Sequence, residues 1–160
     1  MKILFLDIDG VLNSSRTVVA RGGFPHGFSP VCKLRFDNTA LALVRNLCAV
    51  ADVSVVLSSS WRLLHSHGEV ANELDLPIMA ATPNMGGPRG AEIAAWLAQH
   101  PEVSTYAIVD DDSDMPESQL PCFVRTDAEN GLTFGNYREL CAIFGVNEYD
   151  RPPTGPWGGA

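Results

Sequence analysis

Positive charge is scarce in this sequence. Only 11 of its 160 residues are Lys or Arg, against 19 Asp or Glu, so the formal net charge is −8. Because an acidic surface repels the phosphate backbone, an extended non-specific nucleic-acid interface is not expected. A local basic pocket is still compatible with this balance, and so are acidic side chains gathered around a cation.

Closely spaced cysteines and long apolar runs are also missing. The sequence contains four cysteines, Cys32, Cys48, Cys122 and Cys141. None belongs to a C-x-x-C pair, so a zinc site is not expected, and the pattern favours buried or free thiols of a reducing compartment. The apolar run near the N-terminus is interrupted at Asp7, which makes it too short for a signal peptide or a membrane span. We therefore expect a cytoplasmic protein that does not contact a membrane.

Five short apolar runs alternate with segments that have helical periodicity. The runs occupy residues 3–6, 53–57, 77–81, 106–109 and 122–124. Short runs without polar alternation are typical of strands buried on both faces of a parallel sheet. Helices are expected from Asp37 or Asn38 onward, and over residues 61–76, 91–100 and 136–144. The sequence thus predicts an α/β doubly wound (Rossmann-like) fold, a mostly parallel five-stranded sheet with helices on both faces.

One domain, residues 1–147, is predicted, and the short connections leave no room for a large cap domain. Residues 13–36 combine several Gly and Pro residues with the β-branched pair Val18-Val19. We expect this segment to form a flap or minimal cap over the sheet edge, for example as a small hairpin. The Pro/Gly-rich residues 148–160 are expected to be a disordered tail.

Polar clusters follow three of the predicted strands. They are Asp7-Ile-Asp9, Ser58-Ser-Ser60 and Asp110-Asp-Asp112. In open parallel sheets the ligand site lies outside the carboxyl ends of the strands, so we expect these clusters to converge. So many carboxylates in one place are unfavourable without a cation. Hard oxygen ligands favour Mg²⁺ over a transition metal.

The first of these clusters closely resembles a known motif. Residues 2–12, K-I-L-F-L-D-I-D-G-V-L, are similar to the first motif of the haloacid dehalogenase (HAD) superfamily, a hydrophobic strand followed by D-x-D-G-x-L. Ser58, Arg89 and Asp110-Asp111 follow in the order of the second, third and fourth motifs. The resemblance covers roughly residues 2–145. It implies a HAD-type phosphohydrolase.

The resemblance also implies roles for the acidic residues. Asp7 would be the nucleophile that forms an aspartyl-phosphate, and Asp9 would protonate the leaving oxygen and then activate water. Because the dehalogenase and ATPase branches lack the second acid, Asp9 favours a phosphatase or phosphotransferase. Mg²⁺ would bind the Asp7 carboxylate, the Asp9 backbone carbonyl and Asp111, with Asp110 beside it. Which of Asp110 and Asp111 contacts the metal stays open.

The phosphoryl group would be held by polar and cationic groups. Ser58 would donate its hydroxyl, backbone N–H groups around Ser59 would assist, and Arg89 would neutralise charge. Arg62 is a candidate for a second phosphate or a carboxylate. Most of these assignments have a simpler alternative: a turn or calcium loop for D-x-D-G, a helix cap for residues 58–60, a surface position for Arg89 and a solvated turn for the aspartate run.

Three further segments bear on the substrate. The S-S-S-W-R segment at 58–62, the R-G-x-E-I-x-x-W-L segment at 89–97 and residues 126–133 look like a small HAD subgroup associated with RNA repair. They resemble the phosphatase half of polynucleotide kinase-phosphatases more loosely. The resemblance implies a nucleotide or an RNA or DNA terminal phosphate as substrate. No obligate protein partner is evident from the sequence. The alternatives are a phosphatase for a small metabolite or phosphoprotein, and a non-catalytic phosphate-binding module.

Overall fold

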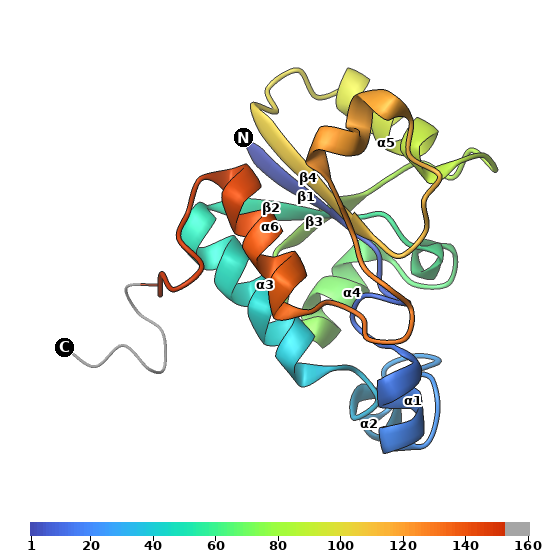
Figure 1. Ribbon diagram of the computed structural model, residues 1–160. Helices are drawn as coiled ribbons and strands as arrows, with labels where there is room; N and C mark the ends of the chain where they lie inside the picture. Colours follow the sequence, from blue (N-terminus) through green and yellow to red (C-terminus); the bar gives the residue numbers. More distant parts are fainter. Residues whose placement is uncertain (153–160) are drawn as a thin grey trace.

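The sheet at the centre of the molecule is open and entirely parallel (Figure 1). The computed structural model describes residues 1–152. The strands are β1 (Lys2–Leu6), β2 (Val53–Leu57), β3 (Ile78–Ala81), β4 (Thr105–Asp110) and β5 (Phe123–Arg125). Their order is β3-β2-β1-β4-β5, and every neighbouring pair is parallel. The predicted fold class is therefore confirmed, with β1 in the middle of the sheet.

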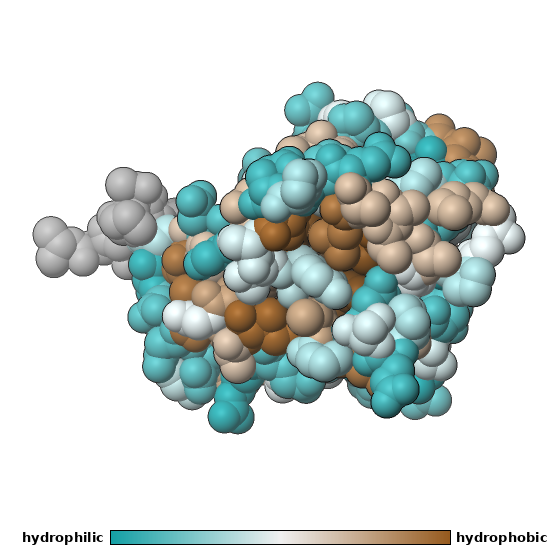
Figure 2. Space-filling model, turned by 90° about the horizontal axis from the view of Figure 1, so that it is seen from above, coloured by the Kyte–Doolittle hydropathy of each residue, from teal (hydrophilic) through white to brown (hydrophobic). Residues whose placement is uncertain are grey.

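Helices cover both faces of this sheet. One face carries α3 (Asn38–Ala51), α4 (His67–Leu74) and α6 (Phe134–Phe144), and the other carries α5 (Arg89–Ala98) with the 3₁₀ helix η2 (Glu117–Cys122) beside it. Alternate residues of β1 face opposite ways, as a strand requires. Leu4 and Leu6 join the core under α3 and α6, whereas Phe5 packs edge-on against Trp96 of α5 at 5.5 Å. Figure 2 views the molecule from above, where hydrophilic side chains surround several hydrophobic patches, some of them near the middle of this face.

Capping side chains determine several helix ends. Asp37 begins α3, because its carboxylate accepts hydrogen bonds from the backbone N–H groups of Thr39 and Ala40. The predicted single helix over residues 61–76 is wrong. The chain instead forms a 3₁₀ helix, η1 (Ser60–Leu63), and begins α4 only after Ser66, whose hydroxyl accepts from Glu69 N–H. A serine side chain that caps a new helix interrupts the one before it.

The segment 13–36, here called the flap, is helical. It contains α1 (Ser15–Arg21) and α2 (Pro30–Lys33), so a small hairpin is the wrong form for it. The β-branched pair lies in α1 because Ser14 and Thr17 form a capping box that begins this helix. Figure 1 shows α1 and α2 beyond the end of the sheet at which the strands terminate.

Three other predictions concern location and the tail. Within residues 1–152, no helix combines the length and apolarity that a membrane crossing requires. All four cysteines are free thiols, and Cys48 and Cys141 are buried. Of the expected tail, Asp150 closes a turn by donating its N–H to the Asn147 carbonyl at 3.0 Å. Residues 153–160 lie outside the described part of the chain, so the prediction of disorder there stays a prediction.

Candidate active site

The ends of three strands meet at one edge of the sheet. Leu6 lies in register with Leu57 of β2 and with Val109 of β4. The pairing continues one residue further, because Asp7 N–H donates to the Val109 carbonyl at 3.1 Å and Ser58 N–H donates to the Leu6 carbonyl at 2.9 Å. The backbone ladder therefore fixes the positions of the polar residues that follow the strands, as the sequence predicted.

Three carboxylates form an acidic cluster at this edge. Asp7, Asp110 and Asp111 each offer an oxygen, and these atoms all lie within 4.8 Å of one another. Asp7 is 6% exposed and Asp110 is 1% exposed. Burial raises the pKa of both carboxyls above the usual range, and the charge of Asp7 raises the pKa of Asp110 further. A Coulombic contact with Arg89 acts in the opposite direction on both.

This acidic cluster fits a divalent cation with hard oxygen ligands. Asp110 Oδ2 is buried and accepts no hydrogen bond within residues 1–152. Asp111 approaches the backbone so closely that a Cβ built on Gly10 would lie 2.3 Å from its Cγ. Gly10 also has a φ of 75°, which disfavours any residue with a side chain. Glycine at position 10 thus permits a close approach of Asp111 that gathers acidic oxygens, which Mg²⁺ would stabilise.

Arg89 is the cation next to the acidic cluster. It begins α5, and its backbone N–H donates to Asp114 Oδ2 at 2.7 Å. Its Nε lies 3.4 Å from Asp110 Oδ2, and its Nη2 lies 4.0 Å from Asp7 Oδ1. The side chain is 18% exposed. The guanidinium is therefore held beside the two buried carboxylates, where an anion bound to them would also meet it.

The serines after β2 differ in what their side chains do. Ser58 Oγ is buried and has no hydrogen-bond partner in the described residues, so its hydroxyl is not committed to another group of the protein. Ser59 caps η1 by accepting from Trp61 N–H. Capping was one of the alternatives for this segment. Ser59 provides the cap, whereas the Ser58 hydroxyl has no partner in the described residues.

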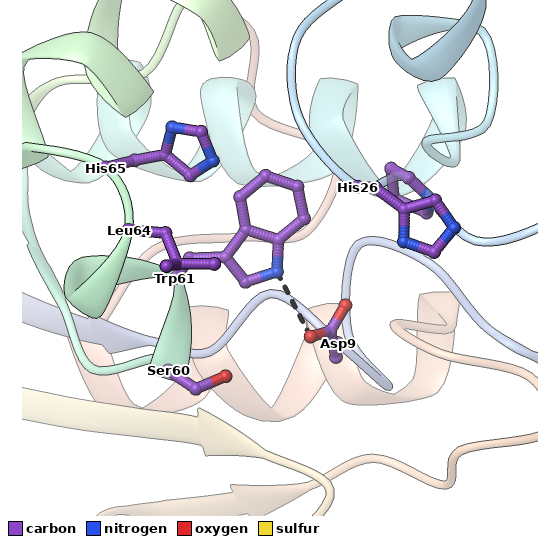
Figure 3. A pocket seen from close by; sticks show the side chains of 7 residues that line it. Asp9, His26, Ser60, Trp61, Leu64 and His65 are labelled. Atoms are coloured by element: carbon purple, nitrogen blue, oxygen red, sulfur yellow. Dashed lines mark hydrogen bonds between the residues drawn. The ribbon is translucent and has the colours of Figure 1, made fainter.

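Asp9 is oriented by two neutral donors. Asn13 Nδ2 donates to Asp9 Oδ1 at 2.8 Å. Trp61 Nε1 donates to Asp9 Oδ2 at 3.1 Å, as Figure 3 shows. No individual role in the site was predicted from the sequence for Asn13 or Trp61. Trp61 is only 7% exposed, and a buried indole N–H requires a partner, which here is Asp9.

The hydrogen bonds of Arg62 go to residues outside the acidic cluster. Its Nη2 donates to Glu92 Oε2 at 2.5 Å, and its Nη1 donates to the Ser59 carbonyl at 2.8 Å. The second Glu92 oxygen accepts from Met85 N–H at 2.8 Å. The two side chains are 9% and 4% exposed. The structure thus pairs Arg62 with a buried acid that sequence reasoning missed, and substrate binding by Arg62 stays a prediction.

Comparison with known families agrees with this geometry. The model of a family described as "HAD domain in Swiss Army Knife RNA repair proteins" matches residues 3–136. The matched range contains the acidic cluster, Asp9, the serines after β2 and both arginines. Searches of curated proteins and of solved structures give no significant match.

Proposed function

The chain belongs to the family of HAD domains in Swiss Army Knife RNA repair proteins, and from this we propose that it is a Mg²⁺-dependent phosphatase. Its substrate would be a phosphomonoester, in particular the terminal phosphate of a nucleotide or nucleic acid. The observation that carries the proposal is the meeting of Asp7, Asp110 and Asp111 within 4.8 Å, with Arg89 beside them. A phosphoryl group needs both features, a cation site and a positive side chain.

The acidic cluster would hold the metal. Asp7 and Asp111 would provide carboxylate oxygens and Asp9 its backbone carbonyl, with Asp110 supporting the site from the buried side. When bound, Mg²⁺ neutralises the negative charge of the carboxylates and of the phosphoryl oxygens. Asp110 Oδ2 supports this assignment, because it is a buried carboxylate oxygen that accepts no hydrogen bond within residues 1–152, although Arg89 Nε lies 3.4 Å away.

Two carboxylates would carry the covalent chemistry. An oxygen of Asp7 attacks phosphorus, the bond between phosphorus and the ester oxygen breaks, and Asp9 gives its proton to that leaving oxygen. A water molecule then attacks the phosphorus of the aspartyl-phosphate while Asp9 takes its proton. The acyl-phosphate bond breaks, Asp7 regains its carboxylate, and inorganic phosphate leaves. Asn13 and Trp61 keep the Asp9 carboxylate in one orientation during both transfers.

The remaining polar groups would hold the transferring phosphoryl. The free hydroxyl of Ser58 donates to one of its oxygens, backbone N–H groups around Ser59 donate to another, and Arg89 balances its charge. Arg62 supports this arrangement from behind, since it fixes the Ser59 carbonyl.

The family description supports a nucleotide or an RNA or DNA end as the substrate, rather than a small metabolite or a phosphoprotein. We propose no membrane contact and no obligate protein partner. The free thiols are compatible with a cytoplasmic location.

A substrate panel tests the proposal. Phosphate release with and without Mg²⁺ is measured for a 3′-phosphorylated oligoribonucleotide, a 5′-phosphorylated one, mononucleotides, a sugar phosphate, a phosphopeptide and an aryl phosphate. We expect Mg²⁺-dependent release, with a terminal nucleotide phosphate preferred. Asp7→Asn should lower turnover by roughly 1,000-fold or more, because the nucleophile is lost.

The matched control is Asp52→Asn. Asp52 is exposed and directly precedes β2, at the opposite end of the strand from the site. Turnover in this variant should equal the wild type. Absence of hydrolysis of every substrate by the wild type would favour the non-catalytic module, and equal turnover in Asp7→Asn would refute the catalytic assignment.

A further inference from the structure

A pocket of about 280 Å³ opens next to Asp9 and has no role in the chemistry above. Its walls come from two segments far apart in the sequence, the flap and the chain around η1. We call it the ring pocket, and its main lining residues are Asp9, His26, Ser60, Trp61, Leu64 and His65. Figure 3 shows His26 on one side and Leu64 and His65 on the other, with the Trp61 indole between them.

Packing of aromatic rings holds these two segments together. Phe28 of the flap lies 5.4 Å from the Trp61 ring and 5.0 Å from the His65 ring, measured between centroids. Phe36, at the end of the flap, lies 5.6 Å from Trp61. The same indole donates to Asp9. The ring pocket is therefore anchored on the side chain that fixes the proton donor.

The position of Asp9 decides which part of a substrate meets this pocket. Its carboxylate must reach the oxygen that leaves phosphorus, so the leaving group lies on the Asp9 side and the transferring phosphoryl lies on the Arg89 side. Because Asp9 both lines the ring pocket and accepts from Trp61, the body of the leaving group extends along this wall.

The residues that line the ring pocket restrict the kind of leaving group that it can bind. Within residues 1–152, no lysine or arginine lines the ring pocket, so it offers no permanently charged cation for a second phosphate. Leu64 is 83% exposed, and together with the imidazoles it presents apolar and planar surface to a ligand. His65 Nδ1 lies 3.2 Å from Glu69 Oε2. The hydrogen-bonding groups left for a ligand are therefore His65 Nε2, the His26 ring nitrogens and the Ser60 hydroxyl. A purely hydrocarbon ring would leave these groups unpaired. Its volume is near the lower end of ligand pockets, about 300 Å³, which suits a single ring system.

We propose that the ring pocket binds the terminal nucleoside of the substrate, with the heterocyclic base against Leu64 and the imidazoles of His26 and His65. This inference rests on the proposed phosphatase function and deepens it. It identifies the leaving group as a nucleoside whose phosphate is removed, and it places the rest of a polynucleotide outside the pocket.

Substrate selectivity tests the ring pocket. The value of kcat/KM is measured for adenosine 3′-monophosphate and for glycerol phosphate, which has no ring, and their ratio is compared between variants. We expect Leu64→Ser, His26→Ala and the double variant to lower this ratio, by roughly tenfold for the double variant, the size of one lost stacking contact. Leu120→Ser, at a half-exposed leucine of η2, is the matched control and should leave the ratio unchanged.

A binding measurement separates this inference from the proposed phosphatase activity. Adenosine, the dephosphorylated product, is titrated into the wild type and the double variant, and binding is followed by NMR chemical shifts. Saturable binding that the double variant weakens supports the ring pocket even if the wild type hydrolyses no phosphoester.

Two results would overturn the inference. One is an unchanged ratio in the double variant together with no saturable adenosine binding. The other is a preference for a phosphotyrosine peptide that the same substitutions abolish, because the pocket would then accept the aryl ring of a protein.

Discussion

The acidic cluster and the ring pocket adjoin the same segment after β1, but they are held in place differently. The acidic cluster is attached to strand ends, where backbone hydrogen bonds such as Asp7 N–H to the Val109 carbonyl fix each residue. The ring pocket is formed by the flap and η1, and side-chain packing keeps them together. We therefore expect changes in the acidic cluster to alter turnover of every substrate, and changes in the ring pocket to alter substrate choice.

Asp9 follows Asp7 of the acidic cluster by two residues and also lines the ring pocket, so its substitution should have an effect second only to that of Asp7→Asn. In Asp9→Asn both proposed proton transfers are lost, and kcat should fall by about 100-fold or more. The fold and Mg²⁺ binding should persist, because the proposed metal ligand is the backbone carbonyl. The loss should be greater for an alkyl phosphate than for an aryl phosphate, whose leaving oxygen needs less help from an acid. Steady-state rates with both esters measure this, and near-normal rates would remove Asp9 from the chemistry.

The two arginines sharpen the comparison, since both border one small cavity beside α5. Arg89→Gln should lower kcat by about 100-fold, because the phosphoryl charge loses its cationic partner. Arg89→Lys should recover part of this loss. Arg138→Gln, at an exposed position on α6, is the matched control. Steady-state kinetics measure these values, and less than a threefold change in Arg89→Gln would contradict the assignment.

Arg62→Gln should affect turnover much less than Arg89→Gln, by less than about tenfold. Its main effect should be on stability, because the buried Glu92 carboxylate loses its partner. We expect the free energy of unfolding to fall by about 3–5 kcal/mol, and the double variant Arg62→Met/Glu92→Leu to recover much of it. Urea unfolding measures both. Full stability combined with a large rise in KM would instead support the substrate contact that the sequence suggested.

The smallest expected effect is the gain in thermal stability when Mg²⁺ binds in the absence of substrate. At a Mg²⁺ concentration of about 100 times Kd, binding should stabilise the protein by about 2.7 kcal/mol, which corresponds to a Tm rise of about 5–10 °C. Asp111→Asn should shrink this rise, whereas Asp52→Asn should keep it. Thermal unfolding with Mg²⁺ and with a chelator measures the difference, and identical shifts in Asp111→Asn and the wild type would speak against metal binding by Asp111.

Local patterns in the sequence predicted much of this molecule. The apolar run before Asp7 indicated a buried parallel strand, and the same kind of run before Ser58 and Asp110 placed their side chains at one sheet edge. These predictions worked because strand burial and strand ends depend on neighbouring residues. The flap was harder, because Val18-Val19 favours a strand while the Ser14–Thr17 capping box begins a helix, and the cap decided the outcome.

By itself, the sequence determined the succession of the five strands, the family, and the set of acidic residues at the sheet edge. Only the tertiary structure decided which side chains pair within the site: Trp61 with Asp9, and Arg62 with Glu92 rather than with a ligand. Such pairs join residues many positions apart, so no local periodicity encodes them. They form where packing leaves a buried polar atom that needs a partner, and that condition exists only once the chain has folded.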